Sequence, residues 1–223
     1  MLFNKMLLFS SMYHHHKVRT ANCMLKTIFE IIRDGGSRYK IAGRDFSRAV
    51  DFLYVTDEDV LTPVGKRGYL RSYIERINRR ELFKRALVIS KRTVKTHDFR
   101  YTELTAAHTD PGRLRRLRET IAKRAHCPVY EVLVDMPEGP SFREASQMFI
   151  RMPSGPELPL SKVFATDWWM NAYAEVKWQG HVFCPADLCR KVGPIAKRVL
   201  EEEFDVEVLP GAIDECSKPD VAS

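Results

Sequence analysis

The chain has 223 residues, of which 44% are hydrophobic and 29% charged, with a formal net charge of +7. This composition can bury a hydrophobic core and argues against a disordered chain, and no apolar run reaches the roughly 18 to 20 residues that spanning a bilayer requires. The positive charge favours a polyanionic partner, such as a nucleotide, a nucleic acid or an acidic membrane surface. Five cysteines without a C-x-x-C pair argue against a disulfide framework, so a soluble cytoplasmic protein without a signal peptide is expected.

The first 34 residues are predicted to form one long helix. Apolar residues between Ala21 and Ile32 recur at three- and four-residue steps, which is the pattern of one helical face. Gly35 and Gly36 then supply the residue without Cβ that a left-handed helix cap needs. No N-cap residue precedes this apolar pattern. We therefore expect that the chain begins inside a helix because its reading frame was cut or restarted. The alternative is a frayed natural N-terminus.

Short helices are predicted next, before the chain turns to mixed structure. Residues 45–54, 69–78 and 80–85 have helical patterns, and Thr56 followed by three acids is typical of a helix N-cap. Residues 86–90 form an apolar, β-branched run that indicates a buried strand.

The second half of the chain alternates between helical and extended patterns. Strands are expected at 129–136, 147–152 and 177–184, and helices at 114–125, at 166–173 and from Pro185 to Phe204. The sequence therefore predicts an α+β fold: a helical segment over residues 1–100, a small mixed domain over 101–209, and an acidic tail over 210–223 that is expected to be disordered.

Several short motifs follow one another along residues 1–203. The first is Tyr-His-His-His-Lys-Val-Arg at 13–19, with Met-Leu at 24–25. Later landmarks are Leu-Tyr-Val-Thr-Asp-Glu-Asp at 53–59, Arg-Arg-Glu-Leu-Phe-Lys-Arg at 79–85 and Lys-Trp-Gln-Gly-His-Val-Phe at 177–183. Each motif alone has low specificity. In their order, however, they resemble the region that follows the catalytic core in HD-domain phosphohydrolases of the deoxynucleotide triphosphohydrolase family, to which the sterile-alpha-motif and HD-domain protein belongs.

The resemblance implies a nucleotide-binding role for the first helix. It places His16 and Lys17 at a deoxynucleotide-binding interface between subunits, and the family's substrate-contacting tyrosine at His14 or, one position earlier, at Tyr13. Lysine suits triphosphate oxygens, and histidine can stack on a base or donate to phosphate. The predicted nucleotide-binding residues are Tyr13, His14, His16, Lys17, Arg80 and Lys84. The alternative is that the histidines form a solvated face, since consecutive helical residues point about 100° apart.

No catalytic or metal-binding residue is predicted. The family's metal ligands, a His, a His-Asp pair and a later Asp, all precede the first motif, so a divalent metal would belong to the missing HD half. Two weaker metal alternatives are the His97-Asp98 pair and a set of His181, Cys184 and Cys189. An intact enzyme with an unrecognised site is a further alternative.

The expected partners are a deoxynucleoside triphosphate and either a second copy of the chain or an HD catalytic segment. A basic nucleic-acid-binding module is the alternative function, because residues 66–95 hold eleven Lys or Arg residues against two acids, and 113–124 hold six against one. Trp168, Trp169 and Trp178 are interpreted as core residues, with base stacking as the weaker alternative.

Overall fold

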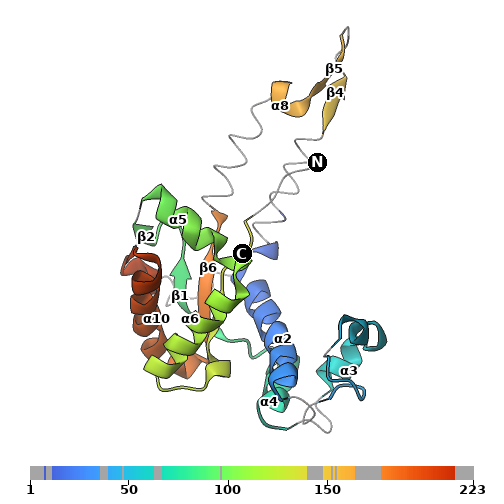
Figure 1. Ribbon diagram of the computed structural model, residues 1–223, viewed down its shortest axis with the longest axis vertical. Coiled ribbons are helices and arrows are strands. Elements are labelled where there is room, and N and C mark those ends of the chain that lie inside the picture. The colour runs from blue at the N-terminus through green and yellow to red at the C-terminus, as the bar shows by residue number, and fades with distance from the viewer. Residues whose placement is uncertain are drawn as a thin grey trace.

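Three antiparallel strands form the centre of the computed structural model (Figure 1). The structure describes residues 8, 12–35, 40–46, 48–62, 67–95, 97–139, 148–151, 153, 155–163 and 177–213. The sheet has the order β1 (Lys84–Ile89), β6 (Gly180–Cys184), β3 (Leu133–Asp135). The sheet thus combines β1, which precedes the expected domain boundary at residue 100, with β6 and β3, which follow it. The boundary itself stays a prediction.

One face of the sheet is covered by three helices, α5 (Asp98–Thr105), α6 (Pro111–Arg124) and α10 (Cys189–Phe204). Leu87, Val182 and Cys184 belong to the same buried cluster as the apolar faces of these helices. The packing is close, because a Cβ on Gly193 of α10 would lie 2.6 Å from the carbonyl oxygen of Ala86. A glycine at this position therefore lets α10 lie directly on the β1 backbone.

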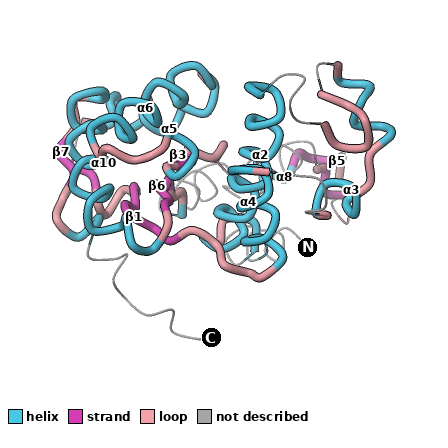
Figure 2. Tube along the Cα trace, turned by 90° about the horizontal axis from the view of Figure 1, so that it is seen from below, coloured by secondary structure: helices cyan, strands magenta, loops and turns pink. Residues whose placement is uncertain are grey.

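The opposite face of the sheet is covered by α2 (His16–Gly35) and α4 (Gly68–Asn78), as Figure 2 shows. Met24 and Ile28 of α2 and Ile74 of α4 are fully buried, and they share a second hydrophobic cluster with Leu133 and Phe183 of the sheet. The apolar face that the periodicity of α2 predicts is thus buried against other elements of this chain.

Shorter elements complete the described part of the chain. Thr56 caps α3 (Asp57–Leu61), where its side chain accepts a hydrogen bond from the backbone of Asp59 and the Asp59 carboxylate accepts one back. β2 (Val94–Lys95) pairs with β7 (Glu207–Val208), and β4 (Phe149–Arg151) pairs with β5 (Glu157–Pro159). The remaining elements are η3 (Ala49–Tyr54), η4 (Ala106–Thr109), η5 (Val129–Glu131), α8 (Leu160–Val163) and η6 (Ala186–Leu188).

The α+β class is confirmed, as are the helix over 69–78 and the strand over 86–90, to within two residues. The predicted helix over 80–85 is wrong. Arg80 has a left-handed backbone (φ 59°), which ends α4, and the chain from Lys84 pairs with β6 instead. The strand expected over 129–136 is shorter, because η5 occupies its first residues.

Some expectations lie partly or wholly outside the described residues. These include the first turns of the long helix, the helix over 166–173 with Trp168 and Trp169, and the tail after residue 213. Of the predicted acidic tail, the structure describes residues 210–213, and Ala212 among them is fully buried. Trp178 is confirmed as a core residue, since it is 2% exposed and its indole N–H donates to the carbonyl of Pro137 at 2.8 Å.

Candidate functional site

The predicted nucleotide-binding residues Tyr13, His14, His16 and Lys17 gather at the start of α2. Their side chains differ in exposure, as expected of consecutive residues around a helical turn. Tyr13 is 57% exposed and Lys17 is exposed, whereas His14 and His16 are half-buried. The rings of His15 and His16 lie 4.4 Å apart, and His15 Nδ1 accepts the backbone N–H of Lys17 at 3.3 Å.

An ion pair connects the first turn of α2 to the sheet. Arg19 donates from Nε to one carboxylate oxygen of Asp135 at 2.9 Å and from a terminal nitrogen to the other at 2.5 Å. Both side chains are largely buried, with exposures of 17% and 5%. A two-point contact of this kind fixes the orientation of both groups. It therefore holds the start of α2 against the end of β3.

His181 lies beside this ion pair and is fully buried. Its ring stacks on Phe183 with centroids 5.0 Å apart, its Nδ1 is 4.0 Å from an oxygen of Asp135, and neither ring nitrogen has a hydrogen-bond partner among the described residues. Burial, as the largest cause, and the nearby basic groups Arg85, His16, Arg19 and His14 together lower the pKa of His181 to about 3. The imidazole is therefore neutral at physiological pH.

The same positive surroundings act on His14. Burial lowers the pKa of its imidazole first, and Arg19 adds to this effect, while Asp135 opposes it. Both histidines thus sit in a region where cationic groups outweigh the nearby carboxylate. A region with this positive charge attracts anions and disfavours protonation of the histidines.

Arg80 and Lys84, also predicted to bind nucleotide, lie elsewhere. Lys84 pairs with Cys184 across the strands, so it projects on the face that α10 covers, and its charge acts on Cys189. Arg80 is exposed in the turn after α4. Arg85 is the basic residue of this segment that faces the histidines, opposite Phe183. Strand alternation from the correct start of β1 would have distinguished Arg85 from Lys84.

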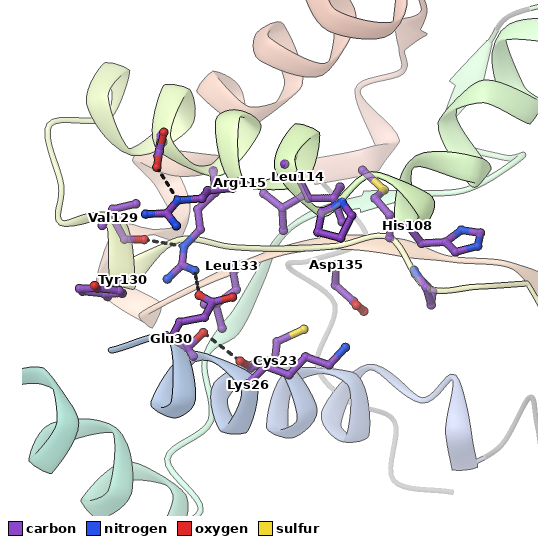
Figure 3. Close-up of a pocket in the computed structure, with 18 of the residues that line it drawn as sticks. Cys23, Lys26, Glu30, His108, Leu114, Arg115, Val129, Tyr130, Leu133 and Asp135 are labelled. Carbon is purple, nitrogen blue, oxygen red and sulfur yellow. Dashed lines mark hydrogen bonds and ion pairs between the residues drawn. The ribbon is translucent and has the colours of Figure 1, made fainter. Parts of the chain in front are cut away.

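A pocket of about 720 Å³ lies between α2 and α6, with β3 along one side (Figure 3). Asp135 points from β3 towards α2, while Glu30 of α2 binds the guanidinium of Arg118. The lining contains five Lys or Arg residues and five Asp or Glu residues. Because these charges balance, the pocket favours a triphosphate less than the start of α2 does.

The basic helix α6 is largely neutralised within the chain. Five of its arginines form ion pairs, with partners on α2, α5, α10 and α6 itself or at its N-cap. These pairs are Arg113 with Glu103 and Glu203, Arg115 with Glu119 and Asp34, Arg116 with Asp110, Arg118 with Glu30, and Arg124 with Glu202. Many of the arginines that suggested a nucleic-acid surface thus form ion pairs that connect helices within the chain.

The metal alternatives gain no support from the geometry. His181 and Cys184 lie on opposite faces of β6, since His181 stacks on Phe183 while Cys184 joins the cluster under α10. In the described ranges no group of three His, Cys, Asp or Glu residues is placed to hold a metal ion. None of the described helices combines the length and apolar composition that crossing a bilayer requires.

The family model described as HD associated region matches residues 1–207. The chain belongs to the HD associated region family. The match covers both faces of the sheet and the helices packed on them. It links the chain to HD-domain proteins, as the motif order suggested. A search of curated proteins finds no match.

Proposed function

We propose that this HD associated region is the nucleotide-binding and assembly part of an HD-domain phosphohydrolase that acts on deoxynucleoside triphosphates. The observation that carries the proposal is the cluster of basic groups at the start of α2, where Arg85 and the Asp135-paired Arg19 lie close enough for their charges to act on the buried His181. Lys17 is exposed on the same first turn of α2 as Arg19 and supplies an ammonium group for triphosphate oxygens. Hydrolysis is assigned to the HD segment, whose metal ligands are expected outside this chain.

The surface next to this charge supports an assembly role. Met12, Tyr13 and Val18 are 55%, 57% and 40% exposed, so large apolar side chains are exposed just before α2 and in its first turn. Exposed apolar groups of this size commonly mark a contact with another protein. We assign this surface to the HD catalytic segment or to a second copy of the chain, which would place the nucleotide at the boundary between them.

The test is a calorimetric titration of the purified chain with dGTP and dATP at constant salt. Lys17→Ala is expected to weaken binding about tenfold, because one charge-assisted contact to phosphate is lost. Lys26→Ala is the matched control, since Lys26 is an exposed lysine on the same helix that lines the charge-balanced pocket. Equal effects of the two substitutions, or no binding of either nucleotide, would contradict the proposal.

The nucleic-acid alternative stays a prediction, and the ion pairs of α6 count against it. A titration with single-stranded DNA at about 50 and about 200 mM salt separates the two functions. A nucleic-acid surface would bind oligonucleotides at low salt, lose them steeply as salt rises, and be insensitive to Lys17→Ala.

A further inference from the structure

Two cysteine sulfurs are in contact where β6 meets α10. Cys184 is the last residue of β6 and Cys189 is the first residue of α10, with a short turn containing η6 between them. Their Sγ atoms are 3.6 Å apart. A disulfide needs about 2.0 Å, so the sulfurs must approach by roughly 1.5 Å, which side-chain rotation next to a turn can supply.

The two thiols have different environments. Cys184 is fully buried and its S–H donates to Cys189, which is partly exposed. This donated hydrogen bond lowers the pKa of Cys189, Lys84 lowers it further, and burial and Asp187 oppose them. Cys189 also begins a 16-residue helix, where the positive end of the dipole stabilises a thiolate. Cys189 is therefore the nucleophile of the pair, and Cys184 the resolving thiol.

We propose that Cys184 and Cys189 form an oxidisable dithiol site that hydrogen peroxide converts to a disulfide. The Cys189 thiolate attacks one peroxide oxygen, so that the O–O bond breaks, the sulfur becomes a sulfenic acid and hydroxide leaves. The Cys184 thiol then attacks the Cys189 sulfur, forming the S–S bond and releasing water. Overall, two thiols lose two electrons and two protons, and one hydrogen peroxide becomes two water molecules.

The disulfide would join the end of the central strand to the start of the helix that covers it. Thiol reduction restores the open form, so the modification is reversible. The proposal is independent of nucleotide binding, because these sulfurs lie on the sheet face opposite the α2 histidines.

Cys127 provides a matched control. It lies near enough for its charge to act on Cys184, and its S–H donates to the carbonyl oxygen of Ala122 at 3.8 Å, much as that of Cys189 donates to the carbonyl oxygen of Pro185 at 3.6 Å. Burial raises the pKa of the Cys127 thiol, so it is expected to react more slowly than Cys189.

The experiment exposes the reduced full chain to stoichiometric hydrogen peroxide and maps its peptides by mass spectrometry without reduction. We expect a linked peptide joining Cys184 to Cys189, lighter by two hydrogens and removed by dithiothreitol. Cys127→Ser should leave this product unchanged, and Cys184→Ser should leave a sulfenic acid on Cys189 that dimedone traps. The wild-type map is decisive even if a variant misfolds. Linkage through another cysteine pair, or oxidation that leaves both thiols free, would overturn the proposal.

Discussion

The buried imidazole of His181 should make the stability of the fold depend on pH. Its pKa is about 3 in the folded chain and near the ordinary value of 6.5 in the unfolded chain. Below pH 6.5 the unfolded state binds a proton that the folded state rejects, so stability is fully present above pH 6.5 and falls towards pH 3 at about 1.4 kcal/mol per unit. Between pH 7 and pH 5 this amounts to a loss of about 2 kcal/mol.

The assay is urea unfolding of the wild type and of His181→Phe at pH 7 and at pH 5. Phenylalanine keeps a flat ring against Phe183 and replaces two nitrogens that have no hydrogen-bond partner in the described part of the chain. The free energy of unfolding should therefore depend less on pH in the variant, by about 2 kcal/mol between the two conditions. His97→Gln, at an exposed position, should retain the wild-type dependence. An equal loss in the wild type and in His181→Phe would refute the reasoning.

Two further substitutions test the packing on either face of the sheet. Asp135→Asn should cost about 3 kcal/mol of unfolding free energy, because it leaves Arg19 largely buried without its carboxylate; a change within the error of urea denaturation would show that the pair is not structural. Gly193→Ala should cost roughly 2 kcal/mol, because the added methyl meets the Ala86 carbonyl. Gly211→Ala is its control, as nothing lies within 4 Å of that position, and similar melting temperatures for the two variants would contradict the close packing.

The site was predictable in part. The histidine and lysine motif identified the start of α2, and their proximity along one helix follows from sequence neighbourhood alone. Asp135 and His181 were not assigned to it, because they come from two strands that only the sheet brings together. Because a helix was predicted over 80–85, the alternation of strand side chains was missed. That alternation places Arg85 and Lys84 on opposite faces of the sheet.

Local patterns determined most of the helices and the α+β class, since periodicity and caps such as Thr56 act within a few residues. The order of the strands, the ion pairs of α6 and the contact between Cys184 and Cys189 were decided only by the tertiary structure. Charge along a sequence does not reveal which carboxylate will lie opposite each arginine. That depends on how helices pack across a sheet, where partners such as Arg118 and Glu30 are 88 positions apart.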